Sequence, residues 1–229
     1  MTTDVSTLTY VYGVTWAATP LPDDVTAVVH RDLAAVTTGV ETRDLRARRR
    51  DLLRHADVVQ RVFDRGPVIP LRFGTVVEDP HEELLEPRHD ELSRLLRELD
   101  GLAEVTVRAS YREDDVLRSL LADDPGLARL RTTAPPVRLG EAIARALAAR
   151  RDADADTIVR TLRPHARDVA VDELRTELEV FRGAFLIPHA ALAQVDAAVD
   201  ELARAQAATT VFKYTGPLPP HHFVHLGVG

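Results

Sequence analysis

An abrupt change of hydrophobic period at Gly66 and Pro67 constrains the fold more than any other feature of the sequence. Before it, apolar residues recur at spacings of three, four and seven, which collects on one helix face Ala56, Val59, Val62 and Phe63. After it, residues alternate as on one face of a strand: Ile69, Leu71, Phe73, Thr75 and Val77. Because proline disfavours helical geometry in the residue before it, we predict a helix that ends at Gly66 and leads directly into a strand from Val68 to Val77.

The predicted strand carries a second face with unusual residues. Pro70 lacks a backbone donor and Gly74 has no side chain, so we expect this strand at or near a sheet edge, with its second face accessible. Arg72 projects from that face between apolar and small residues. Its guanidinium could form a buried ion pair that joins two domains, or it could recognise another polypeptide.

The first hundred residues predict a mixed domain with a small sheet. Leu8–Trp16 alternates as a strand, and Leu33–Thr37 is a shorter strand candidate. Asp23 or Asp24 could cap a short helix that runs through Val28 and Val29. A longer helix is predicted from Thr42 to Arg65, with Leu45 on its inward face.

The order of elements from Leu102 to Gly216 predicts a second domain. Leu102–Tyr111 has the pattern of a half-buried strand, with Glu104 on the exposed face, and it is followed by helices, two strands, a helix and a last strand. That order is the βαββαβ order of a ferredoxin-like sheet. We therefore predict an α+β protein with an N-terminal α+β domain (1–100), a ferredoxin-like domain (101–216) and a C-terminal tail (217–229) that docks on a domain or on a partner.

Composition excludes several classes of function. The net charge of -7 argues against a nucleic-acid partner, because such proteins need a basic face. Without cysteine, the chain has no disulfide and no thiol chemistry. It has no apolar run long enough to span a membrane and no signal-peptide pattern, so we expect a cytoplasmic protein.

The sequence also lacks the motifs that support catalysis or cofactor binding. Glycine-rich phosphate loops, a nucleophile elbow and a zinc-protease motif are all absent. His221, His222 and His225 offer too few ligands for structural zinc, and the aspartates at 152, 154 and 156 lack the glycine and glutamate of a calcium loop. We therefore expect no enzyme activity, no cofactor and no metal site.

Two motifs carry a family resemblance. The run PVIPLRFGTVV follows a helix that contains HADVV, and the run YTGPLPPHHFV spans Tyr214–Val224 near the other end of the chain. Together with a weaker match at Tyr10, Tyr12 and Gly13, they resemble motifs of the gas vesicle protein F/L family (GvpF/GvpL). The motifs are shared by the F and the L members and do not separate them.

The resemblance implies a function that the residues alone do not reveal. It implies a non-enzymatic accessory protein of gas vesicle formation, an assembly factor or minor structural component that binds the hydrophobic shell protein GvpA and has other gas vesicle accessory proteins as candidate partners. The expected location is the gas vesicle in the cytoplasm. As a hypothesis, part of the partner contact comes from two groups of residues: Arg72, Phe73, Gly74 and Thr75, and Tyr214, Gly216 and Pro217.

Two other classes of function remain open at this point. A ferredoxin-like scaffold can serve as a small-molecule-binding regulatory module, which predicts a melting temperature raised by a ligand. It can also host an enzyme, which requires a pocket where an acid, a base or a nucleophile converge.

Overall fold

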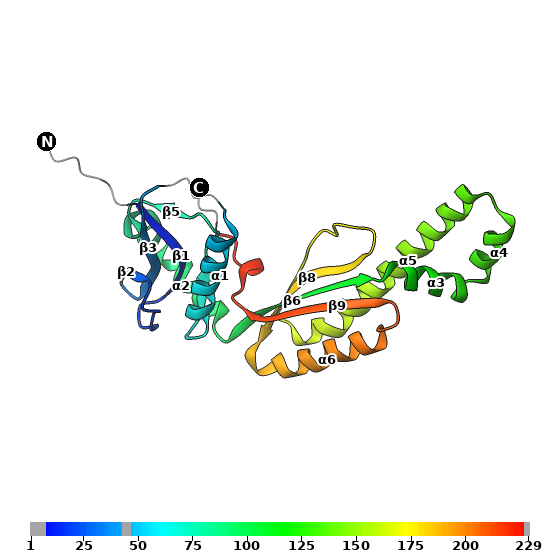
Figure 1. The fold of residues 1–229 in the computed structure, drawn as a ribbon. Helices are drawn as coiled ribbons and strands as arrows, with labels where there is room; N and C mark the ends of the chain where they lie inside the picture. Colours follow the sequence, from blue (N-terminus) through cyan, green and yellow to red (C-terminus); the bar gives the residue numbers. More distant parts are fainter. Residues whose placement is uncertain (1–7, 43–46, 227–229) are drawn as a thin grey trace. The chain divides into compact units, whose positions relative to one another are not determined.

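The computed structural model describes residues 8–42 and 47–226, which form two compact units (Figure 1). Unit 1 contains the chain up to Glu104 and again from Leu218, whereas unit 2 is Val105–Pro217. Each unit has its own sheet with helices packed against it, so the predicted α+β class is confirmed.

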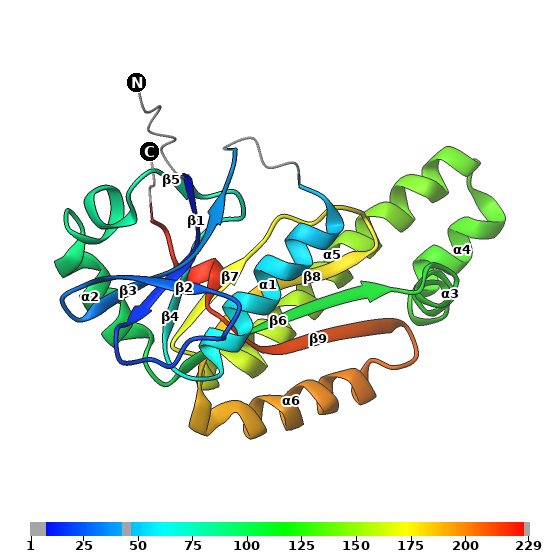
Figure 2. The same cartoon turned by 60° about the vertical axis from the view of Figure 1, so that its left-hand side comes forward.

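Unit 1 is built on a five-stranded sheet with the order β2-β3-β1-β4, in which β5 also pairs with β1. In chain order its elements are β1 (Leu8–Trp16), β2 (Thr26–His30), β3 (Leu33–Val40), α1 (Arg49–Phe63), β4 (Val68–Pro70), β5 (Val76–Val77), the short helix η1 (His81–Leu85) and α2 (His89–Leu99). Helix α1 lies against one face of the sheet and α2 against the other (Figure 2).

The period change at Gly66 and Pro67 forms the predicted helix-to-strand transition. Helix α1 ends at Phe63, and β4 begins at Val68. The helix buries Val58, Val59 and Val62 against Tyr10 and Tyr12 of β1. The helix begins at Arg49, because Arg48 before it has extended backbone geometry, so the predicted start at Thr42 is wrong. Positions 43–46, including Leu45, lie outside the described residues.

Three further predictions for unit 1 are wrong. The short helix expected through Val28 and Val29 is the strand β2, because its β-branched residues pair with β3 in an antiparallel ladder. The strand expected from Val68 to Val77 is interrupted by a turn at residues 72–75, which separates β4 from β5. The edge position of β4 is confirmed by the strand order, but Val68, Ile69 and Pro70 are all buried, so its second face is not accessible.

Unit 2 has the element order of a ferredoxin-like domain with a longer helical insertion. Its elements are β6 (Leu102–Tyr111, which begins in unit 1), α3 (Glu113–Asp123), α4 (Pro125–Thr133), α5 (Pro136–Leu162), the short helix η2 (Arg163–His165), β7 (Asp168–Val171), β8 (Glu179–Pro188), the short helix η3 (His189–Ala191), α6 (Leu192–Ala205) and β9 (Thr210–Leu218). The strand order is β7-β8-β6-β9, so the first and third strands of the unit lie together at the centre.

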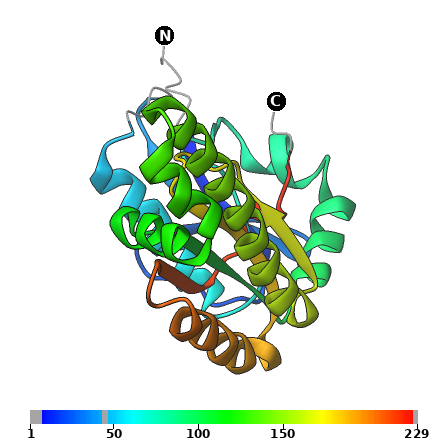
Figure 3. The same ribbon diagram turned by 90° about the vertical axis from the view of Figure 1, so that its right-hand side faces the viewer.

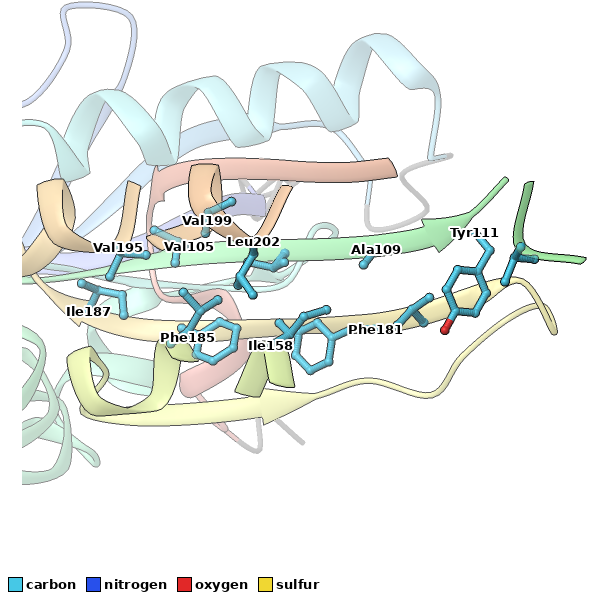
Figure 4. Packing of buried hydrophobic residues seen from close by; sticks show 14 of the residues in the cluster. Val105, Ala109, Tyr111, Ile158, Phe181, Phe185, Ile187, Val195, Val199 and Leu202 are labelled. Carbon is cyan, nitrogen blue, oxygen red and sulfur yellow. The ribbon is translucent and has the colours of Figure 1, made fainter. Parts of the chain in front are cut away.

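The core of unit 2 lies between the sheet and its helices. Alternate residues of β6 and β8 point into this core, where they meet apolar side chains of α5 and α6 (Figure 4). Phe181 and Phe185 stack at a tilt with 5.8 Å between ring centroids, and Ile158 of α5 is fully buried beside them. The alternation of apolar and polar residues that predicted β6 therefore corresponds to the face of β6 that is buried in this core.

The 27-residue helix α5 is longer than the sheet needs. Its N-terminal half continues beyond the strands and packs against α3 and α4, which gives a helical arm that faces the viewer in Figure 3. We use "helical arm" below for α3, α4 and this half of α5. None of the helices in the described residues is long and apolar enough to cross a membrane.

Gly13 and Gly140 offer a matched test of backbone packing. A methyl group at Gly13, beside the bulge in β1, would lie 2.7 Å from the carbonyl oxygen of Ile69, whereas one at Gly140 on α5 would have no heavy atom within 4 Å. We expect Gly13→Ala to lower the free energy of unfolding by about 1–3 kcal/mol, because backbone must shift. We expect Gly140→Ala to raise it by about 1 kcal/mol, since alanine favours helix. Denaturant melts of both variants measure this, and an unaffected Gly13→Ala protein would contradict the close approach of β1 and β4.

Candidate partner-binding site

Arg72, Phe73, Gly74 and Thr75 form a tight turn between β4 and β5. The backbone N–H of Thr75 donates to the carbonyl oxygen of Arg72 at 3.2 Å, and the Thr75 hydroxyl donates to the same oxygen at 2.8 Å. Gly74 has a φ of +91°, which glycine adopts without the steric cost that a side chain would bring. Gly74, which was placed within a strand from the sequence, is therefore the residue that allows the chain to turn.

Buried hydrogen bonds attach this turn to β1 and α1. The ring of His55, which is 7% exposed, lies between the Tyr10 hydroxyl at 2.7 Å from Nδ1 and the Leu71 carbonyl oxygen at 3.1 Å from Nε2. A carbonyl oxygen only accepts, so Nε2 carries the proton and Nδ1 accepts from Tyr10. The Tyr10 oxygen accepts in turn from the backbone N–H of Gly74 at 3.3 Å. We call this chain of bonds the Tyr10–His55 relay.

Aromatic rings surround the relay. Tyr10 lies edge-on to Tyr12 with 4.7 Å between ring centroids, and the His55 ring stacks on Tyr12 at 5.6 Å. Phe73 packs edge-on against both Tyr10 and His55, at 6.1 and 5.9 Å. Phe73 thereby anchors the turn from within, and it is not a freely exposed contact residue.

The apolar surroundings hold both relay side chains in their neutral forms. Burial raises the pKa of Tyr10 to about 12, although its bond from the Gly74 N–H opposes the shift. Burial lowers the pKa of His55 below its ordinary value, and the bond to Leu71 opposes that shift only in part. The relay is therefore intact at neutral pH.

Arg72 is the exposed charged residue of the turn. Its guanidinium makes no hydrogen bond and no ion pair with any residue in the described ranges, so the buried ion pair considered from the sequence is not present there. A free guanidinium on a rigid turn offers a forked set of donors for a carboxylate or for backbone carbonyl groups.

Tyr214, Gly216 and Pro217 lie in unit 2 on β9, at the edge of the sheet. Tyr214 packs against the core, and its hydroxyl donates to Asp196 of α6 at 2.6 Å. Burial, followed by this hydrogen bond, raises the pKa of Tyr214. Its role is structural, whereas Gly216 and Pro217 are exposed on the edge strand. The seven candidate residues therefore belong to different units.

The segment after β9 returns to unit 1, where it packs through buried Pro219 and Pro220. In the short helix η4 (His221–Phe223), both the backbone N–H and the ring Nδ1 of His222 contact the Glu104 carboxylate, at 2.8 and 2.6 Å. Glu104 is 1% exposed, which corrects its predicted place on an exposed strand face. The partner that covers it is 118 residues away in the sequence, so local alternation could not reveal it.

A second group of histidines lies where β2, η1 and α2 meet. His30 Nδ1 is 2.8 Å from His81 Nε2, and His89 Nε2 is 2.6 Å from Asp32. The bond to Asp32 raises the pKa of His89, whereas desolvation lowers that of His30. Across the described ranges, no three histidine or acidic side chains are placed to hold a metal ion.

The sequence pattern did not lead us to predict the buried polar roles of His55 and Glu104, although the position of His55 gives a signal. His55 precedes Val58, Val59 and Val62 by three, four and seven residues, so it belongs to the buried face of α1. A histidine on that face is expected to find polar partners.

Comparisons with known proteins agree with this fold. A family model described as gas vesicle synthesis protein GvpL/GvpF matches residues 8–225. Gas vesicle protein F of Streptomyces sp. (strain CB03234) is 34% identical, and the match covers 94% of this chain and 99% of that protein. Gas vesicle protein F of Dolichospermum flosaquae is 26% identical, with 79% of each chain covered.

Solved structures of similar proteins share the architecture. The crystal structure of the gas vesicle protein GvpF from Anabaena sp. PCC7120 has a TM-score of 0.82 at 21% identity and covers 96% of this chain and 97% of its own. The structure of GvpF from Microcystis aeruginosa has a TM-score of 0.77 at 21% identity, with 96% and 100% covered. At this identity the likeness shows the fold alone.

The neutral state of His55 predicts a pH dependence. Its folded pKa is lowered, so its contribution to stability is present above the unfolded value of 6.5 and is lost as the pH falls below it. His55→Gln should lower the free energy of unfolding at pH 7.5 by about 1–3 kcal/mol, because glutamine cannot keep both bonds. The deficit should shrink at pH 5.5. Urea melts of both proteins at the two pH values measure this change, and a deficit independent of pH would show that the folded ring is not held neutral.

The pair His222 and His225 tests the attachment of the C-terminal segment. His222→Ala removes a partner from the buried Glu104 carboxylate and should lower the free energy of unfolding by about 1–3 kcal/mol. His225→Ala, three residues further on and exposed, should change it by less than about 0.5 kcal/mol. Equal melting temperatures for the two variants would mean that the Glu104 contact does not hold the segment.

Proposed function

The chain belongs to the GvpL/GvpF family of gas vesicle synthesis proteins, and from this premise we propose that it binds the gas vesicle shell protein GvpA. In this proposal it acts without catalysis, as an assembly factor or minor structural component in the cytoplasm, and other gas vesicle accessory proteins are further candidate partners. The Arg72 turn provides the first contact.

The observation that carries the proposal is a guanidinium, that of Arg72, which has no hydrogen bond or ion pair among the described residues and stands on a rigid turn. The Tyr10–His55 relay holds the backbone on both sides of the turn, and Val11 N–H also donates to the Thr75 carbonyl oxygen at 2.9 Å. Arg72 is exposed beyond it. The backbone of the turn is therefore ordered before binding, so binding has to order only the Arg72 side chain, which lowers the entropic cost of a contact there.

The edge strand β9 supports a second contact. Its alternate residues Val211, Lys213 and Thr215 are exposed, and it ends the strand order of the unit 2 sheet. An edge strand can pair with an extended segment of another protein, which is how aggregation-prone sheet proteins are commonly held. Gly216 and Pro217 would lie at the end of such a contact.

One observation supports a role without catalysis. The tyrosine and histidine of the Tyr10–His55 relay are buried, and their polar atoms are committed to each other and to the backbone. These polar groups serve the protein's own structure.

Arg72 gives the decisive test. We expect Arg72→Ala to change the free energy of unfolding by less than about 0.5 kcal/mol, because the side chain is exposed. Retention by tagged GvpA, co-expressed in the same cells, should fall by about tenfold or more, as for the loss of a charge-assisted hydrogen bond. Thermal melts and quantitative co-purification measure the two effects.

Arg97→Ala is the matched control, since Arg97 is another exposed arginine of unit 1. It should affect neither stability nor retention. If Arg72→Ala is folded and retained like the parent protein, the turn is not the contact. Deletion of the chain after Gly216 is a poorer test, because it also removes the His222 contact of the buried Glu104.

A further inference from the structure

The helical arm of unit 2 carries a hollow that the proposed GvpA contacts do not use. It lies between α4 and α5 and has a volume of about 440 Å³. Residues of α4 form one wall and residues of α5 the other, so the hollow is a groove between two helices. We call it the α4–α5 groove.

The floor of the groove is apolar and shallow. Leu127 and Leu130 of α4 stand three residues apart, and Ala142 and Ala146 of α5 stand four apart, so each pair lies on one helix face. Leu127 is 4% exposed, and the other three are partly buried against the core of unit 2. Because Ala142 and Ala146 carry only methyl groups, the α5 part of the floor leaves room for side chains of a third element.

One arginine stands on each wall. Arg129 comes from α4 and Arg145 from α5, and neither guanidinium has a hydrogen bond or ion pair within the described residues. The acid of the groove, Asp124, is committed to capping α4, since its carboxylate accepts from the N–H groups of Gly126 and Leu127 at 2.7 and 3.2 Å. Two guanidinium groups and one carboxylate line the groove, so its formal charge is positive on a chain whose net charge is -7.

We propose that the α4–α5 groove binds an amphipathic helix of another gas vesicle protein, with apolar side chains on one face and carboxylates on both sides of that face. An apolar floor between two cationic walls is complementary to such a helix, and amphipathic helices commonly bind in apolar grooves. A small free anion would leave the apolar floor exposed. The identity of the partner as a gas vesicle protein rests on the proposed function, whereas the chemistry of the groove does not.

The test uses the full chain and two synthetic helical peptides that differ only in charge. One carries leucines on one face and glutamates beside them, and the other has lysine at every glutamate position. Fluorescence anisotropy should show binding of the glutamate peptide, weakened by added salt, and no binding of the lysine peptide. Arg129→Gln combined with Arg145→Gln should weaken binding by about tenfold or more.

Arg131→Gln is the control, because Arg131 is an exposed arginine of the same helix that does not line the groove. It should bind the glutamate peptide like the parent protein, and circular dichroism should show that all variants are folded. Absence of binding, equal binding of the lysine peptide, or equal effects of the Arg131 and Arg129/Arg145 changes would each overturn the proposal. Because no GvpA is present in this assay, its failure is separate from failure of the Arg72 test, which uses GvpA and leaves the groove unchanged.

Discussion

The neutral ring of His55 joins strand β1 to the Arg72 turn. One ring nitrogen accepts from the Tyr10 hydroxyl and the other donates to the Leu71 carbonyl oxygen, and a second proton on the ring would take this acceptor away from the Tyr10 O–H. Burial among Tyr12 and Phe73 supplies the low polarity that keeps the ring neutral. The position of the turn, and of any partner bound there, therefore depends on one tautomer in the core of unit 1.

Elements defined by local alternation could be predicted from the sequence to their end residues. β1 and β6 are examples, because alternating residue types mark an extended segment, although β1 buries consecutive residues and β6 alternates in burial only after Val105. Gly66 and Pro67 likewise mark a transition that backbone geometry imposes in any context. The class of the fold was accessible for the same reason, whereas the family came from the resemblance of two motifs.

The features that escaped prediction depend on partners distant in sequence. The run from Val68 to Val77 alternates like one strand, yet Gly74 adopts a positive φ and the turn is held by Tyr10, more than sixty residues earlier. Glu104 is buried because His222 covers it. Arg129 and Arg145 have the sequence pattern of ordinary solvent-exposed residues on charged helices. Only the packing of α4 on α5 places them on opposite walls of the groove.

The two units are completed at different times during synthesis, because of the order of their segments in the chain. Unit 2 is an insertion, since the chain leaves unit 1 after Glu104 and returns to it at Leu218. Residues 218–226 emerge from the ribosome only after the whole of unit 2, so the buried carboxylate of Glu104 waits for its His222 partner throughout that interval. We expect unit 2 to fold as a continuous piece while unit 1 stays incomplete. Unit 1 can then be completed only after the chain has been synthesised through His222.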